Sequence, residues 1–244
     1  MTTSRPHLFG LLAGLALSAG LCFASVTFTR AWTRISEEQV VNVTGSARKE
    51  VRSDLVLWRA GFSSDAETLA DAHARSKADL SRVETFLRAA GQHDYVVRPV
   101  QVSDLFERIK TEQGEISRRT GYRIRQSIEV RSADVEAVPR LASDAVRLLE
   151  QGIMLASEGM EFIYTKAGEA KIEMMGEAAK DARIRAEQIA AQGGRTLKEL
   201  RSARMGVVQI NPLYSTATSW EGNNDTSSLE KTITTTVTAT FSLE

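Results

Sequence analysis

The stretch VVNVTGSARKEV, Val40 to Val51, opens the folded part of the chain. Val41 and Val43 alternate with polar residues, as in a half-buried strand. The small residues Thr44–Ser46 could also belong to a phosphate loop. Such a loop needs more glycine, a lysine and an immediately following helix, whereas Asp54 and a second apolar stretch follow here. We therefore predict that Thr44–Ser46 forms a β-turn at the exit of the first strand and is not an active site.

The segment that precedes this strand, Leu8 to Thr29, contains no charged residue. As a helix it would extend about 33 Å, which matches a hydrocarbon core of about 30 Å. We predict that residues 1–33 are a short tail and a transmembrane anchor that contacts the lipid bilayer through residues 8–29, with residues 34–39 as a spacer. A cleaved signal peptide is the alternative, because small residues precede Ser25.

Small residues recur at every fourth position of this segment, at Gly10, Gly14 and Ser18. Such a ridge allows two membrane helices to pack closely, so we predict that these residues form a helix-packing surface. The alternative is that export segments are simply rich in small residues.

The composition excludes several classes of protein. Basic and acidic residues are equal in number, 31 of each, so no broad positive field would attract nucleic acid. The single cysteine, Cys22, lies in the N-terminal apolar segment, so the folded domain can form neither an internal disulfide nor a thiolate metal site. A hydrophobic share of 42% is sufficient for a substantial core.

From residue 40 onward the hydrophobic pattern changes repeatedly between strand and helix periods. It predicts strands near 40–45, 53–62, 94–106, 121–132, 153–165, 202–210 and 231–244, helices near 66–91, 135–152 and 166–192, a polar joining segment at 110–120 and a long loop at 211–228. This order indicates an α+β fold with mostly antiparallel sheets and packed helices. It also suggests a duplicated strand–helix–strand unit.

Four local features of these segments give further expectations. In the strand over 53–62, Trp58 and Phe62 share one face, as in a half-buried strand. Pro99 cannot donate to a sheet, so its segment should lie at an edge or bulge. Asp134 is expected to cap the helix over 135–152, and Glu129 is expected on the polar face of the strand over 121–132.

Two other segments carry longer patterns. In the helix over 166–192, the residues that we predict to face a sheet are Ile172, Met175, Ala179, Ala182, Ala186 and Ile189. In the last segment, threonines alternate with apolar residues from Ile233 to Leu243, which is the clearest strand pattern in the protein.

Three stretches together resemble the SIMPL domain family. Residues 40–62 are similar to its first strand pair, with an alternating strand that ends in Thr-Gly. Residues 121–153 resemble its central strand, turn and helix, and residues 177–200 resemble its alanine-rich helix. The resemblance covers residues 40–244, which we take as one SIMPL-like domain. The segment after Val102 and the loop from Asn211 to Ser228 depart from the family pattern.

The resemblance implies an exported protein of the bacterial envelope, since family members there are antigens and stress-linked proteins, some of them assembled into large rings. Charge alone would place the domain inside the cell, because Arg30 and Arg34 follow the apolar segment, but this rule is weak before a long domain. We therefore expect a single-pass inner-membrane protein with its C-terminal domain in the periplasm, or a soluble periplasmic protein after signal cleavage. No catalytic residue set can be transferred from the family.

We accordingly predict a non-enzymatic envelope protein that acts as an oligomeric scaffold or interaction module, in stress defence, with a second copy or another envelope protein as its partner. The alternative is a periplasmic small-molecule or peptide-binding or chaperone-like protein. A hydrolase built from dispersed acids is a third hypothesis. We expect no catalytic residue, no cofactor and no metal site.

The histidines, a cluster of arginines and two loop aromatics are the remaining candidate site residues. His73 and His93 lack the neighbouring ligands of a zinc site and are expected at the surface. The arginines at 118, 119, 123, 125 and 131 are expected on an ion-paired face, with contact to lipid headgroups or a partner as the alternative. Tyr214 and Trp220 lie in the long polar loop, where they are either tucked onto the core or offered to another subunit; we predict that they form a subunit interface.

Overall fold

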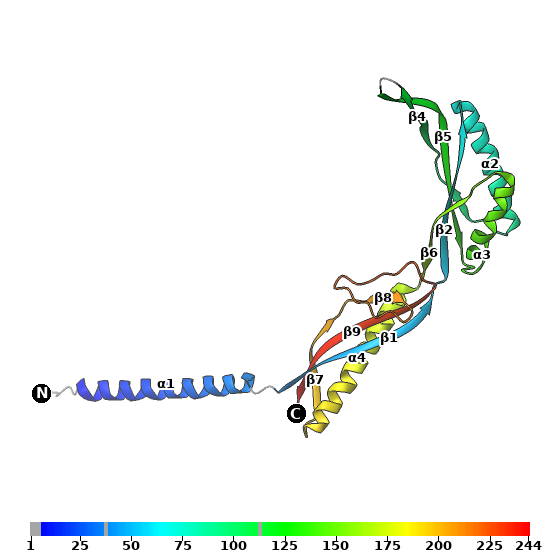
Figure 1. Cartoon of the computed structure of the whole chain (residues 1–244). Coiled ribbons are helices and arrows are strands. Elements are labelled where there is room, and N and C mark those ends of the chain that lie inside the picture. The colour runs from blue at the N-terminus through cyan, green and yellow to red at the C-terminus, as the bar shows by residue number, and fades with distance from the viewer. Residues whose placement is uncertain (1–5, 37–38, 112–113) are drawn as a thin grey trace. The chain divides into compact units, whose positions relative to one another are not determined.

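The computed structural model describes the backbone at residues 6–36, 39–111 and 114–244. Side chains are described at these positions except at 6–9, 12, 13, 31–36 and 111. The helices are α1 (Pro6–Ser36), α2 (Leu69–Ala89), α3 (Ala137–Asp144) and α4 (Ala167–Gln192), with a 3-10 helix, η1 (Ala145–Gln151), directly after α3 (Figure 1). The strands are β1 (Val40–Arg52), β2 (Leu55–Ala66), β3 (Tyr95–Val97), β4 (Gln101–Thr111), β5 (Gly114–Ser132), β6 (Ala156–Ile163), β7 (Leu197–Met205), β8 (Gln209–Pro212) and β9 (Glu230–Leu243).

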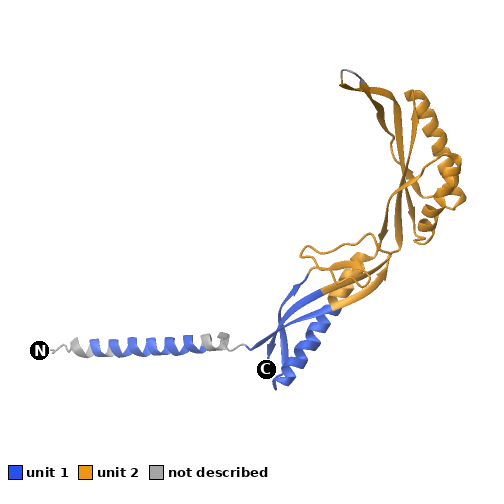
Figure 2. Ribbon diagram, in the orientation of Figure 1, with its two compact units in different colours: residues 1–46, 177–206, 236–244 blue, residues 47–176, 207–235 orange. Residues whose placement is uncertain are grey.

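These elements form two sheets with helices, and the strand pairs whose register is defined are antiparallel, which confirms the predicted α+β class. The chain divides into two compact units (Figure 2). Unit 1 comprises residues 1–46, 177–206 and 236–244, and unit 2 comprises residues 47–176 and 207–235. No observation tests the suggested duplication.

Unit 2 contains a five-stranded sheet in the order β3-β5-β2-β6, with β4 also paired to β5. The predicted joining segment at 110–120 is wrong: β4 and β5 form one long hairpin that continues through it, with residues 112 and 113 outside the described part. The side chains described from Glu115 to Thr120 are exposed. A strand with neither face buried shows no apolar alternation, so the sequence pattern could not reveal it.

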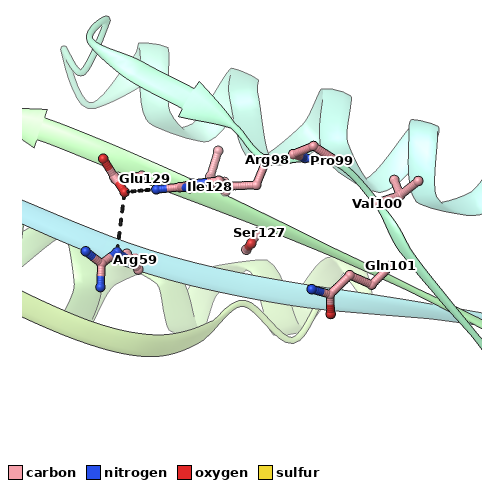
Figure 3. Close-up of a pocket in the computed structure, with 8 residues that line it drawn as sticks. All are labelled: Arg59, Arg98, Pro99, Val100, Gln101, Ser127, Ile128 and Glu129. Carbon is pink, nitrogen blue, oxygen red and sulfur yellow. Dashed lines mark hydrogen bonds and ion pairs between the residues drawn. The ribbon is translucent and has the colours of Figure 1, made fainter.

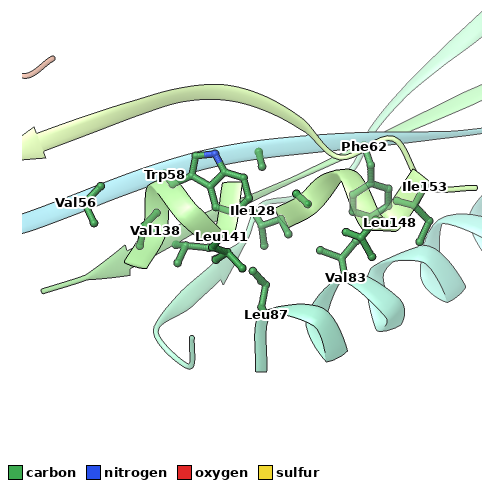
Figure 4. Close-up of a cluster of buried hydrophobic side chains, with 13 residues drawn as sticks. Val56, Trp58, Phe62, Val83, Leu87, Ile128, Val138, Leu141, Leu148 and Ile153 are labelled. Atoms are coloured by element: carbon green, nitrogen blue, oxygen red, sulfur yellow. The ribbon is translucent and has the colours of Figure 1, made fainter. Parts of the chain in front are cut away.

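The core of unit 2 lies between this sheet and the helices α2 and α3 (Figure 4). Trp58 and Phe62 of β2 are buried on the predicted face, and Val83 and Leu87 of α2 pack against them. The helix start is defined by Thr68, whose hydroxyl accepts a hydrogen bond from the backbone N–H of Asp71 at 3.2 Å. Such a cap stabilises a helix by about 1 kcal/mol.

The second helical region begins with Glu136 at the N-cap of α3, two residues after Asp134, which was predicted to cap it. A carboxylate oxygen of Asp134 accepts hydrogen bonds from the backbone N–H groups of Glu136 and Ala137, at 3.2 and 3.0 Å. The region ends at Gly152, which has a φ of 76°. The predicted single helix is divided into α3 and η1, both of which contribute buried residues to the core.

Two predicted strands are interrupted. The strand over 94–106 is divided into β3 and β4 around Pro99, which was expected at an edge or bulge because proline cannot donate to a sheet. The strand over 202–210 is part of β7 and β8, which separate at Gly206. An added Cβ at Gly206 would lie 2.2 Å from the side-chain hydroxyl of Thr236 and 3.2 Å from its carbonyl oxygen, so a side chain there would require the threonine to move.

In unit 1, helix α4 packs on the sheet formed by β1, β9 and β7. The predicted stripe of α4 is right at Ala182 and Ala186, which are buried, and wrong at Ile172 and Ile189, which are 69% and 54% exposed. The buried residues of α4 are Ala170, Met174, Ala178, Ala182, Ala186 and Ala190. Alanines spaced four apart give the helix a smooth ridge, which lets it approach a sheet more closely than isoleucines would.

Gly45 explains why that close approach is needed. An added Cβ at Gly45 would lie 2.2 Å from both the carbonyl oxygen of Ala178 and the backbone nitrogen of Ala182. The next residue, Ser46, donates its backbone N–H to the carboxylate of Asp181 on the same helix, at 2.8 Å. The predicted β-turn at Thr44–Ser46 is therefore wrong, since these residues lie inside β1 and form its contact with α4.

The final strand β9 agrees with its predicted pattern. Ile233, Val237, Ala239 and Phe241 are all buried, and most of the intervening threonines are half-buried. Ala239 and Phe241 pack with Val41 of β1 in unit 1.

Helix α1 contains the predicted N-terminal apolar segment. Within the residues that the structure describes, no helix combines the length and apolar character needed to cross a membrane, so the transmembrane part of that prediction is not confirmed. The predicted spacer at 34–39 lies partly outside the described residues, as does the N-terminal tail.

Candidate interaction surface

The aromatic loop, residues 213–229 between β8 and β9, carries the largest exposed side chains of unit 2. Trp220 is 84% exposed and Tyr214 is 80% exposed. The sequence left open whether these aromatic rings are tucked onto the core or offered to a partner. In the isolated chain they are offered to solvent.

Gln209 of β8, a buried residue, fixes the backbone of the loop through hydrogen bonds of its side chain. Its side-chain amide donates to the carbonyl oxygen of Ser219 at 2.7 Å, and its side-chain oxygen accepts from the backbone N–H groups of Ser219 and Asn223 at 3.2 and 2.9 Å. One side chain thus satisfies three backbone groups of the loop. Ser219 is the neighbour of Trp220, so these bonds fix the backbone beside the exposed indole.

A second buried amide, Asn211, repeats this arrangement near Tyr214. Its side-chain nitrogen donates to the carbonyl oxygen of Ala217 at 2.7 Å, while its oxygen accepts from the side chain of Asn223 at 2.8 Å. Buried amides that are fully hydrogen-bonded specify one loop conformation, because any other would leave them unpaired.

The end of the loop is fixed by a buried ion pair. Lys231, whose side chain is only 1% exposed, lies 3.2 Å from a carboxylate oxygen of Asp225 and also donates to the Asp225 backbone carbonyl. Burial would raise the pKa of Asp225, but hydrogen bonds from Ser227, Ser228 and Lys231 outweigh it and lower the pKa to about 2. The carboxylate of Asp225 is therefore ionised at neutral pH.

Two residues in the loop adopt left-handed backbone conformations. Tyr214 has a φ of 68°, which costs a non-glycine residue about 1 kcal/mol. Gly222 has a φ of 94°, and an added Cβ there would lie 2.7 Å from a methyl carbon of Val207. The backbone of the exposed Tyr214 is therefore strained, within a loop that the hydrogen bonds of Gln209 and Asn211 keep in one conformation.

The predicted arginine face is largely ion-paired. Arg123 makes two hydrogen bonds to Asp65, at 2.8 and 2.7 Å, and Arg125 contacts Glu158 at 2.7 Å. Arg119 lies 3.8 Å from a carboxylate oxygen of Asp104. These contacts confirm the predicted ion pairing for three members of the cluster. Arg131 also forms an ion pair, with Glu129.

Glu129 differs from its prediction. It was expected on the solvent face of its strand, but its side chain is only 4% exposed because three arginine side chains cover it. Hydrogen bonds from Arg98 and Arg131 lower the pKa of Glu129 to about 2, against the opposing effect of burial.

The remaining predicted residues lie apart from this surface. His73 and His93 are exposed, and within the described residues no three histidine, cysteine or acidic side chains are grouped as a metal would require. Gly10 and Gly14 have nothing within 4 Å of an added Cβ, and Ser18 donates to the carbonyl oxygen of Leu15 at 3.0 Å. Helix packing through these residues stays a prediction.

Sequence reasoning identified Tyr214 and Trp220 but missed their supporting residues. Gln209, Asn211 and Lys231 are buried polar residues in or beside strands. Their burial could have been inferred from the sequence in one way, because each is a polar residue at a position where the alternation of the strand calls for an apolar one.

The comparison with known proteins agrees with this architecture. The model of the SIMPL family, described as a protein of unknown function (DUF541), matches residues 41–241. No curated protein matches the chain significantly. The family match covers most of the chain, from β1 to β9, and includes the aromatic loop. The chain belongs to the SIMPL family.

Proposed function

We propose that this protein is a non-enzymatic interaction module that self-associates through its aromatic loop and acts as an oligomeric scaffold. The single observation that carries this proposal is the exposure of Trp220 and Tyr214 on a loop whose backbone is fixed by buried polar side chains. Tryptophan and tyrosine are the residues that most often dominate the binding energy of protein interfaces.

The rigidity of the loop supports a binding role more than exposure alone does. A flexible loop would lose conformational entropy on binding, about 0.5–1.5 kcal/mol for each side chain that is immobilised. The hydrogen bonds of Gln209 and Asn211 order the loop backbone before binding, so the entropy of ordering that backbone is lost during folding. The side chains of Trp220 and Tyr214 still lose rotamer freedom when a partner covers them.

A second copy of the chain is the partner that we propose. The chain has a formal net charge of zero, so copies can approach one another without a long-range repulsive field. The aromatic loop also supplies the apolar centre that interfaces require, with a polar rim of serine, threonine and asparagine.

The experiment compares assembly size in three forms of the full-length chain. Tyr214→Ala with Trp220→Ala should shift the assembly to smaller species in sedimentation velocity, because truncation of one such anchor costs at least about 2 kcal/mol, a factor of about 30 in affinity. Phe106→Ala removes an exposed aromatic residue of β4 outside the loop and should leave the assembly unchanged. Equal assembly sizes in the wild type and the double variant would refute the proposal.

We further propose that the protein is located in the cell envelope. Its domain would lie outside the cytoplasm and be attached to the inner membrane through residues 8–29. The support is the uncharged sequence from Leu8 to Thr29 and the family membership of the domain. A role in stress defence is part of the same proposal. Fractionation with carbonate extraction tests the attachment: the chain should stay in the membrane pellet, and release as a free periplasmic protein would favour signal cleavage.

A further inference from the structure

The five-stranded sheet of unit 2 has one face covered by helices and one face that carries charged side chains. Trp58, Ile128 and Val130 point to the core, and the residues that alternate with them, Arg59, Ser127, Glu129 and Arg131, lie on the other face. A cavity of about 530 Å³ opens on this second face beside Arg59, Arg98 and Glu129 (Figure 3). Its volume falls within the range of small-molecule sites, about 300–1,000 Å³.

The positive charge at this cavity exceeds the negative charge by one. Glu129 accepts hydrogen bonds from Arg59, Arg98 and Arg131, and Arg59 also contacts Glu161 at 3.0 Å. Of the charged residues that line the cavity, two are arginines, Arg59 and Arg98, and one is acidic, Glu129. Because the side chain of Glu129 is nearly inaccessible, it stays in place as a fixed counter-charge, and one positive charge at the cavity is left uncompensated.

The polar groups that face the cavity are mainly donors. Among the described residues, Arg98 uses one nitrogen for Glu129, so the other N–H groups of its guanidinium are available. Gln101 and the hydroxyl of Ser127 line the same cavity from β4 and β5. Several donors around an excess positive charge suit an oxyanion, which accepts hydrogen bonds only.

The rest of the lining suits a hydrocarbon group. Pro99 and Val100 form part of the wall, and Val100 is 43% exposed although it is apolar. A smaller cavity of about 240 Å³ shares Pro99, Gln101 and Ser127 with the first, and adds the Arg125–Glu158 pair, which contributes no net charge. The adjoining space is therefore polar but electrically balanced.

We propose that this cavity binds a small organic monocarboxylate, with the carboxylate against the N–H groups of Arg98 that Glu129 leaves free and the hydrocarbon part against Pro99 and Val100. A monoanion neutralises the single excess charge. A dianion such as sulfate or hydrogen phosphate (HPO₄²⁻) would leave a net negative charge beside the buried Glu129, and it would not use the apolar wall. The cavity is thereby selective for carboxylates over inorganic dianions.

The probe is sodium benzoate, and its binding to the full-length chain is followed by saturation-transfer difference NMR at constant ionic strength. We expect saturable binding with a dissociation constant of about 1 mM or tighter, and a response at least about tenfold weaker for sulfate and phosphate as competitors. Arg98→Met should weaken benzoate binding about tenfold or more. Glu129 keeps Arg59 and Arg131 in this variant, and circular dichroism checks that the chain is folded.

Two further variants keep the test decisive. Gln101→Leu with Ser127→Ala leaves the contacts of Glu129 intact, and we expect it to weaken binding several-fold through the loss of donors alone. Arg123→Met changes an arginine of β5 that pairs with Asp65 and does not line the cavity, so benzoate binding should be unchanged. The proposal is overturned if binding does not saturate, if sulfate competes as well as benzoate, or if Arg98→Met and Arg123→Met have equal effects.

Discussion

Gly45→Ala is the sharpest test of how the sequence builds unit 1. The new methyl group would lie 2.2 Å from two backbone atoms of α4, whereas an ordinary contact begins at 3.4 Å. Helix backbone cannot rotate away as a side chain can, so α4 must separate from β1 by roughly 1 Å at that point. Overpacking of this kind costs about 1–3 kcal/mol. Replacing a strand glycine returns about 0.5–1 kcal/mol through the unfolded chain, which leaves a net destabilisation of roughly 0–2.5 kcal/mol. We expect the upper end of this range, because both close contacts are with backbone atoms.

The assay is urea denaturation followed by far-ultraviolet circular dichroism, with Gly176→Ala as the matched control. Gly176 lies inside α4 and has nothing within 4 Å of an added Cβ, so alanine there should stabilise the helix by about 1 kcal/mol. We expect the urea midpoint to fall for Gly45→Ala and to rise for Gly176→Ala. If both midpoints rise, the close approach of β1 and α4 is not what fixes glycine at position 45.

Three further predictions concern buried charge and backbone strain. Lys231→Met should destabilise the chain by about 3 kcal/mol in urea, because Asp225 is left without its cation; an effect below about 0.5 kcal/mol would show that the pair is dispensable. Tyr214→Gly should be more stable than Tyr214→Ala by about 1 kcal/mol, since glycine accepts a φ of 68° without strain, and equal stabilities would contradict this. The pKa of Glu129 is about 2 in the folded chain and near 4.5 in the unfolded one. Ionised Glu129 therefore stabilises the folded state fully above pH 4.5, and this contribution is lost progressively as the pH falls toward 2. The stability difference between wild type and Glu129→Gln should therefore shrink over that window, and a constant difference would contradict the assignment.

The alternating patterns of unit 2 and of β9 were predictable because a strand with one buried face shows its geometry in the sequence. Trp58 and Phe62 are buried as expected, and so is Val237. The stripe of α4 was predictable only in part: Ala182 and Ala186 are buried as expected, but hydrophobicity also favoured Ile172 and Ile189, which are exposed. Where β1 meets the helix, Gly45 brings its backbone against Ala178 and Ala182, and this close approach depends on a residue far away in the sequence.

The candidate surface was predictable only in part. Large aromatic residues in a polar loop drew attention to Tyr214 and Trp220, but nothing in the spacing indicated whether they would be exposed. Their exposure depends on hydrogen bonds that Gln209 and Asn211 make across the loop, and such contacts leave no periodic signal. The cavity beside Glu129 depends likewise on arginines from three strands or their ends, brought together by the sheet.

The central claim is that copies of this chain associate through the aromatic loop, and sedimentation equilibrium of the full-length chain in density-matched detergent tests it most directly. The chain has a mass of 26.8 kDa. We predict a protein mass that is a multiple of this value and that falls toward 26.8 kDa in the Trp220→Ala, Tyr214→Ala variant. A mass of 26.8 kDa for the wild type at every concentration, or a multimer that the double variant preserves, would contradict the claim.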